Sequence, residues 1–248
     1  MMDSNQNDLT FWDHLDLLRG TLIRCLAAVV LCSIAAFCLK DWLFALLFAP
    51  SSNDFITYRL LGTEPFTIRF INTELASQFM MHIEVSLLAG FVVASPYILA
   101  EIYRFIAPAL YENERRHSVG ITAFAVLLFM AGIVLTYFVI FPFAFRFLAT
   151  YQVNDLVVNQ ISLRSYISTL LILSLMMGLL FEMPVLALVL SRLGLISAGT
   201  LRRYRRHAIV VLVALSAVIT PTGDAFTLLL VSLPLYLLYE FSIMIIRK

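Results

Sequence analysis

Charged side chains are scarce in this chain. Asp, Glu, Lys and Arg make up 13% of its 248 residues, whereas hydrophobic residues make up 61%. A soluble domain has about a quarter of its residues charged, so the composition excludes an ordinary soluble protein. It indicates a polytopic membrane protein whose solvent is mostly lipid. The net charge of +1 gives no indication of nucleic-acid binding.

Cysteine is also rare, and its placement argues against redox or metal chemistry. Cys25, Cys32 and Cys38 all lie in the first apolar segment, with no Cys-x-x-Cys or Cys/His cluster. The chain likewise lacks a glycine-rich phosphate loop, a nucleophile elbow and metal-ligand spacing. We therefore expect no catalytic residues, no cofactor, no metal and no enzymatic activity. The polar N-terminus lacks the features of a cleaved signal peptide, so the first apolar segment is expected to stay in the protein.

Long apolar runs are what the chain has instead. They predict an all-α membrane protein with six transmembrane helices. Prolines at positions 96, 142, 184 and 234 predict kinks, which would make the arrangement of the helices concave. The last two helices are expected to be short, because about 14 residues of the fifth cover only about 21 Å. The expected spans form one domain: 22–39, 79–99, 119–148, 166–190, 207–220 and 226–246.

Basic residues predict the orientation of these spans. Most of them fall on one side of a six-span arrangement, which places both termini in the cytoplasm. The strongest anchor is the run that contains Arg202, Arg203, Arg205 and Arg206. This run either sets the topology and contacts lipid headgroups, or it forms a docking surface for a partner.

The N-terminal segment has the pattern of an amphipathic helix. Thr10 and Asp13 have the spacing of a capping box, and apolar residues then recur at helical intervals. We expect this helix to lie at the cytoplasmic interface with Trp12 at headgroup depth. It serves either as an interfacial anchor or as a recognition surface to which Asp13 and Asp16 add negative charge.

The most informative stretch is 105–116, FIAPALYENERR, a charged turn between two apolar segments. A glutamate at the end of a membrane helix attracts a cationic peptide strongly, because the local dielectric constant is low. Glu114 is the candidate. The alternative is that Glu114 only pairs at the surface with Arg115 or a neighbouring arginine.

Acidic residues within the apolar spans are functional candidates, because burying a charge in a membrane is costly. Glu182 is the sharpest, since it precedes Met183-Pro184, where the helix loses a backbone hydrogen bond. It is alternatively buried in protonated form or paired with a hydroxyl. Glu84, Glu182 and His82 together also allow a second hypothesis, a proton-coupled secondary transporter of a small solute. A third hypothesis is a membrane scaffold whose loops only hold partners.

Several of these motifs resemble the TatC family, the multi-spanning subunit of the twin-arginine protein translocase. FIAPALYENERR is similar to the first cytoplasmic loop of the family. His14–Arg19 resembles its N-terminal pattern, although Leu17 stands where the family has a glutamate and the acid is Asp16 instead. Phe181–Pro184 and Thr220–Asp224 resemble two further family motifs. Single positions that match are Pro50 and Glu240.

The resemblance implies a function in protein transport at the cytoplasmic (inner) membrane, driven by the proton-motive force. It implies that twin-arginine signal peptides of folded cargo are bound by residues of the loop and the N-terminal segment: Glu114, Phe105, Pro108, Arg115, Asp16 and Arg19. It further implies TatA- and TatB-like single-span partners in an oligomeric complex within the lipid bilayer. The residues assigned to partner contact and translocation are Glu182, Pro50, Asp224 and Glu240.

Overall fold

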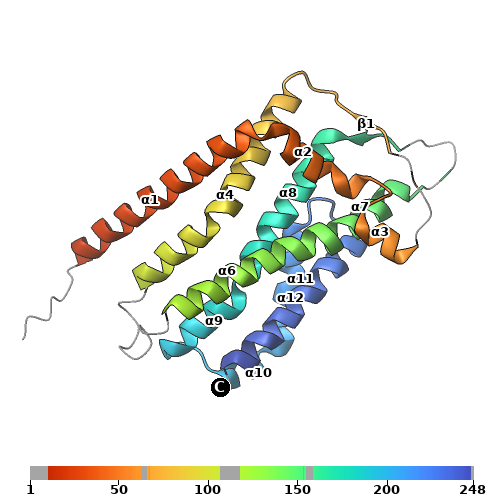
Figure 1. The fold of residues 1–248 in the computed structure, drawn as a ribbon. Helices are drawn as coiled ribbons and strands as arrows, with labels where there is room; N and C mark the ends of the chain where they lie inside the picture. Colours follow the sequence, from red (N-terminus) through yellow and green to blue (C-terminus); the bar gives the residue numbers. More distant parts are fainter. Residues whose placement is uncertain are drawn as a thin grey trace, which may run out of the picture.

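Helices carry nearly all of the chain that the computed structural model describes, which is residues 11–62, 66, 68–106, 118–152, 154 and 159–246 (Figure 1). The helices are α1 (Phe11–Cys38), α2 (Lys40–Phe48), the 3-10 turn η1 (Ala49–Ser51), α3 (Ile56–Leu61), α4 (Ser77–Ile106), α6 (Ser118–Leu135), the π-helical turn η3 (Thr136–Ile140), α7 (Phe141–Thr150), α8 (Leu163–Leu180), α9 (Met183–Arg192), α10 (Ala198–Arg203), α11 (Arg205–Ile219) and α12 (Ala225–Ile246). Two short strands, β1 (Phe70–Ile71) and β2 (Ile161–Ser162), pair in parallel.

Five segments of the described chain are long and apolar enough to cross a membrane: Leu15–Cys38, Ser77–Phe105, Gly120–Thr150, Leu163–Arg192 and Ala225–Ile246. The fifth expected span corresponds to α11, whose 15 residues reach about 22 Å and make it short, as the sequence predicts. The sixth differs from the expectation. With 22 residues, α12 reaches about 33 Å, enough for a hydrocarbon core of about 30 Å.

Prolines coincide with two interruptions of the spans. The π-helical turn η3 ends immediately before Phe141-Pro142, and the break between α8 and α9 falls at Phe181 and Glu182, just before Pro184. Proline lacks a backbone N–H and clashes with the preceding turn, which explains both positions. The helices α4 and α12 continue through Pro96 and Pro234.

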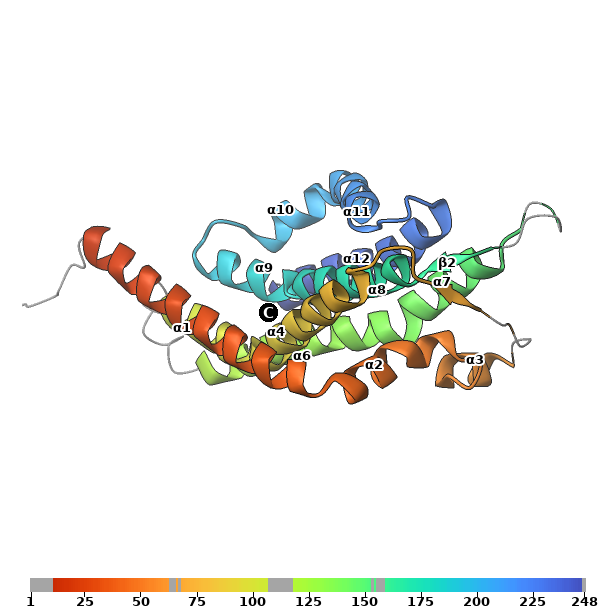
Figure 2. The ribbon, with the colours of Figure 1, turned by 90° about the horizontal axis from the view of Figure 1, so that it is seen from above.

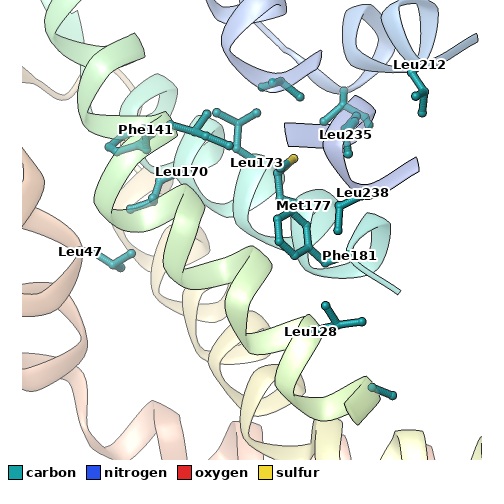
Figure 3. Packing of buried hydrophobic residues seen from close by; sticks show 14 of the residues in the cluster. Leu47, Leu128, Phe141, Leu170, Leu173, Met177, Phe181, Leu212, Leu235 and Leu238 are labelled. Atoms are coloured by element: carbon teal, nitrogen blue, oxygen red, sulfur yellow. The ribbon is translucent and has the colours of Figure 1, made fainter. Parts of the chain in front are cut away.

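The core is built around α8, which packs against α4, α6, α7 and α11. Its residues Leu170, Leu173 and Met177 are buried, and Figure 3 shows them between α6–α7 on one side and α12 on the other. Glycine permits a close crossing of α6 and α8: a Cβ atom on Gly132 of α6 would lie 2.6 Å from the carbonyl oxygen of Met177. Small residues at such crossings let membrane helices gain van der Waals contact.

The long connection between the first two spans is structured, with α2, η1, α3 and β1 in it, and forms a cap. The buried hydroxyl of Tyr58 lies 3.1 Å from the carbonyl oxygen of Pro50 and 3.0 Å from that of Pro142. The guanidinium of Arg146 lies over the Tyr58 ring, 5.9 Å from its centroid. Burial raises the pKa of the Tyr58 phenol above its usual range. These contacts hold the cap against α7.

The start of α1, the end of α4, the start of α6 and the end of α12 all lie at one end of the molecule (Figure 1). Viewed from above, α10 and α11 lie on the opposite side of the molecule from α2 and α3 (Figure 2). This arrangement gathers the N-terminal segment and the termini of α4 and α6 at the same end.

Candidate functional site

Most of the predicted signal-binding loop lies outside the described residues, including Pro108, Glu114 and Arg115. Phe105 is described and is half-buried in the last turn of α4. The structure describes the two helix ends that flank the loop, with α4 ending at Ile106 and α6 beginning at Ser118. The loop therefore connects two helix ends at the same end of the molecule as the start of α1.

The predicted N-terminal interfacial helix is part of the first span. Residues 11–38 form one continuous helix, so Asp16 and Arg19 lie on the early turns of α1 and both are exposed. Trp12 is also exposed, at 73% of its surface. Leu17 is exposed beside them and offers no charge at the position where the family pattern has its glutamate.

The sequence reasoning missed an acidic residue, Glu101, which is the centre of an ion-pair cluster between α1 and α4. Its Oε2 atom accepts hydrogen bonds from Arg24 Nε at 3.1 Å and Arg24 Nη2 at 2.8 Å. Its Oε1 atom accepts one from Arg104 Nη1 at 2.8 Å. Glu101 is buried, whereas both arginines reach solvent.

A sequence signal for Glu101 existed. It lies three residues before Arg104, a spacing that brings side chains together on a helix. The expected second span ended at residue 99, which left Glu101 outside the set of membrane acids. Its second partner, Arg24, lies 77 residues away in the sequence and is brought to it by the packing of α1 on α4.

Glu182 lies at the break between α8 and α9, where the sequence places a functional acid. Its residue surface is 8% exposed, and its Oε1 atom is buried without a hydrogen-bond partner among the described residues. Its backbone is held, because the Glu182 carbonyl accepts a hydrogen bond from Leu186 N at 2.9 Å. A buried carboxylate without a partner is unfavourable in the ionised form, so this position is costly to the fold.

An apolar groove of about 730 Å³ runs between α1, α4 and α8. Glu84 and Arg164 are its charged lining residues, and the rest are mainly leucines and other apolar side chains. Leu179 lines it, one turn before Glu182, although Glu182 itself is not part of the lining. The groove therefore approaches the Glu182 break without including its carboxylate.

The remaining predicted partner residues each make a structural contact. Glu240 of α12 accepts a hydrogen bond from Arg205 Nη2 at 2.6 Å and one from Tyr236 at 3.2 Å. Asp224 caps α12, since its Oδ1 atom accepts a hydrogen bond from Thr227 N at 2.7 Å. Burial alone would raise the pKa of Asp224, but hydrogen bonds from Thr222 and Thr227 outweigh it and lower the pKa. Pro50 supplies the carbonyl that faces Tyr58.

Comparison with known proteins decides the family. The model of the Sec-independent protein translocase protein (TatC) matches residues 13–234. The chain belongs to the TatC family. A TatC protein of Blattabacterium sp. subsp. Periplaneta americana is 34% identical over 259 aligned residues, which cover 98% of this chain and 97% of the relative.

Solved TatC structures share the fold. One described as the twin-arginine translocase receptor TatC superimposes with a TM-score of 0.79 and 34% identity, covering 94% of this chain and 98% of that one. A second, described as the same receptor in DDM, has a TM-score of 0.81 and 33% identity, covering 95% and 100%. The predicted all-helical membrane fold is thereby confirmed, and TatC membership makes this chain a non-enzymatic subunit of a protein translocase.

Proposed function

We propose that this chain is the signal-peptide receptor of a twin-arginine translocase and binds its ligand at the cytoplasmic face through Glu114. Both termini are cytoplasmic in this proposal, and the membrane is the cytoplasmic one. A guanidinium forms a bidentate pair with a carboxylate that lysine cannot reproduce, which accounts for selection of arginine. Phe105, Pro108 and Arg115 contribute to signal-peptide binding with Glu114, and Asp16 and Arg19 of α1 complete the set of binding residues.

The Arg24–Glu101 ion pair carries this proposal, because it joins the middle of α1 to the last turns of α4. Glu101 lies four residues before Phe105, where the loop begins, and Arg24 lies five residues after Arg19. The part of α1 that follows Arg19 and the part of α4 that precedes the loop are thus neighbours in space, which supports the proposal. The apolar stretch of a signal peptide adds affinity through burial, at about 25 cal/mol per Å².

The same proposal includes single-span TatA- and TatB-like partners in an oligomeric complex that transports folded cargo. Glu182 is the polar contact for a partner helix, supported by its buried, unpartnered oxygen among the described residues. Pro50 supports translocation by holding the cap. Asp224 and Glu240 support it by holding the hairpin that α11 and α12 form. The proton-motive force supplies the energy.

The transporter hypothesis requires a proton relay from Glu84 and Glu182 to His82. In the structure His82 Nε2 lies 3.1 Å from the carbonyl oxygen of Phe37, and its ring stacks on Phe37. His82 is therefore held by α1, and no contact in the described chain joins it to either glutamate. TatC membership favours the receptor, and we do not retain the transporter.

A photo-crosslinking experiment tests the proposed receptor. A photoreactive residue at position 114 is exposed to a twin-arginine signal peptide and to the same peptide with both arginines changed to lysine. We expect strong labelling by the first peptide only. In cells, Glu114→Ala should abolish export of a twin-arginine substrate while membrane levels of the chain stay normal. Equal labelling by both peptides, or normal export by the variant, would contradict the role of Glu114.

A further inference from the structure

The Glu101 carboxylate already holds two arginine side chains in the structure. Both of its oxygens accept hydrogen bonds, Oε2 from Arg24 and Oε1 from Arg104. The two arginines come from different helices and converge on one buried acid. This is the arrangement that a pair of consecutive arginines on an arriving peptide would make with an acidic site.

The three side chains differ sharply in exposure. The Glu101 side chain is 3% exposed, the Arg24 side chain 54% and the Arg104 side chain 76%. The carboxylate is therefore reached from solvent at the positions that the two guanidinium groups occupy. Of the two, Arg104 is the more exposed and the more readily moved aside.

Their other contacts also differ. Arg24 makes two hydrogen bonds to Glu101 and a third to Thr21 Oγ1 at 3.1 Å. Arg104 makes a single hydrogen bond to Glu101, and in the described part of the chain this is its one ion pair. Arg24 is thus the fixed partner of Glu101, and Arg104 is the weakly held one.

We propose that Glu101 is a second guanidinium site, which Arg104 occupies in the resting chain and vacates when an arginine of the signal peptide enters. This inference rests on the proposed receptor function and identifies a further residue of its binding site. The exchange replaces one guanidinium by another while Arg24 stays in place, so the buried carboxylate is never left unpaired. Glu101 thereby supplies a carboxylate to the proposed binding site, whereas Leu17 supplies none.

Glu101 is suitably placed for this role. It lies in the last two turns of α4, four residues before Phe105 and immediately ahead of the loop that carries Glu114. A static ion pair that only joins α1 to α4 is the competing explanation for the same contacts. The two explanations predict opposite effects when Arg104 is removed.

The test measures binding of a fluorescent twin-arginine signal peptide to the purified full-length chain. If Arg104 competes with the peptide, Arg104→Gln should tighten binding by about two- to five-fold, which is the range expected for loss of an exposed ion pair. Glu101→Gln should weaken it by about tenfold, because a charge-assisted hydrogen bond is lost. In the double variant the gain from Arg104→Gln should disappear.

A matched control removes the effect of net charge. Arg203 is exposed on α10, and Arg203→Gln removes the same charge from the molecule without touching Glu101. If Arg104 competes with the peptide, Arg203→Gln should not tighten binding of the twin-arginine peptide. Arg104→Gln should likewise not tighten binding of a peptide in which both arginines are lysine. Thermal unfolding of each variant reports whether it is folded, and Arg104→Lys, which keeps an ion pair, gives a second folded reference.

Three results would overturn the inference: weaker or unchanged binding by Arg104→Gln, an equal gain from Arg203→Gln, or a gain that persists in the double variant. Each would leave Glu101 as a static contact between α1 and α4. The receptor function itself is tested separately, because it fails if the wild-type chain does not distinguish twin-arginine from twin-lysine peptides. A chain that makes this distinction but shows no gain with Arg104→Gln contradicts the inference alone.

Discussion

Gly90 of α4 packs directly on the backbone of Ser33 of α1, so closely that a Cβ atom on Gly90 would lie 2.6 Å from the Ser33 Cα atom. No ordinary Cβ contact is this short, and besides the Ser33 Oγ atom the obstructing atoms are the Ser33 backbone N and Cα atoms, which cannot move aside as a side chain can. The pair therefore sets how near α1 lies to α4. The same packing brings Arg24 to Glu101 further along the two helices.

Gly90→Ala should destabilise the chain, because the added methyl group forces α1 and α4 apart. Overpacking of this kind costs about 1–3 kcal/mol, which thermal unfolding in detergent measures as a lower midpoint. Gly120→Ala is the matched control, since Gly120 lies in α6 with nothing within 4 Å of its added Cβ atom. The control should be neutral or more stable by about 1 kcal/mol. A Gly90→Ala variant as stable as this control would contradict the close packing of α1 on α4.

Tyr58→Phe should loosen the cap that connects the first two spans. The change removes the hydroxyl that lies near the Pro50 and Pro142 carbonyl oxygens. Leaving buried carbonyl groups unsatisfied costs about 1–3 kcal/mol, visible as a lower unfolding midpoint. Tyr151→Phe removes a hydroxyl from an exposed tyrosine and should change the midpoint little. Equal effects from the two changes would show that the Tyr58 hydroxyl does not hold the cap.

Asp224→Ala should destabilise α12 by about 1 kcal/mol, the usual contribution of an N-cap. The pKa of Asp224 is lowered from its ordinary value of 3.8, so its charged form stabilises the folded chain. That contribution is present above the ordinary pKa and is lost as pH falls through the lowered folded value. We therefore expect the difference in unfolding midpoint between wild type and Asp224→Ala to shrink on acidification below pH about 4. Asp224→Asn retains a neutral cap, and its midpoint should be less sensitive to pH than that of wild type.

Glu182→Gln should separate the stability of the chain from its function. The amide has the shape of the carboxylate but is less costly to bury without a partner, so the unfolding midpoint should stay the same or rise. Export of a twin-arginine substrate should fall if the carboxylate contacts a partner helix. Glu84→Gln is the control, because Glu84 is exposed in the groove. Neutralising an exposed carboxylate removes no cost of burying a charge, so the unfolding midpoint should change little. A destabilised Glu182→Gln variant would show that the carboxylate is satisfied in the folded protein.

The spans were predictable from sequence because lipid permits few alternatives. A segment such as Leu163–Arg192 has to be helical to satisfy its backbone in a membrane, and apolar length alone marks it. Pro142 and Pro184 likewise coincide with interruptions, because proline in a helix interior removes a backbone hydrogen bond, although α4 and α12 continue through Pro96 and Pro234. The expectation that the last helix is short is wrong, although its expected bounds, 226–246, lie within one residue of α12.

The sequence by itself therefore determined an all-helical membrane protein, its family and the acidic residues worth testing, because composition and short motifs depend only on neighbours along the chain. Tertiary structure alone decided which charges distant in the sequence meet. Arg24 and Glu101 are 77 residues apart, and no local pattern relates them. They form an ion pair because Gly90 lets α1 approach α4, and the burial that results makes the Glu101 carboxylate depend on arginine.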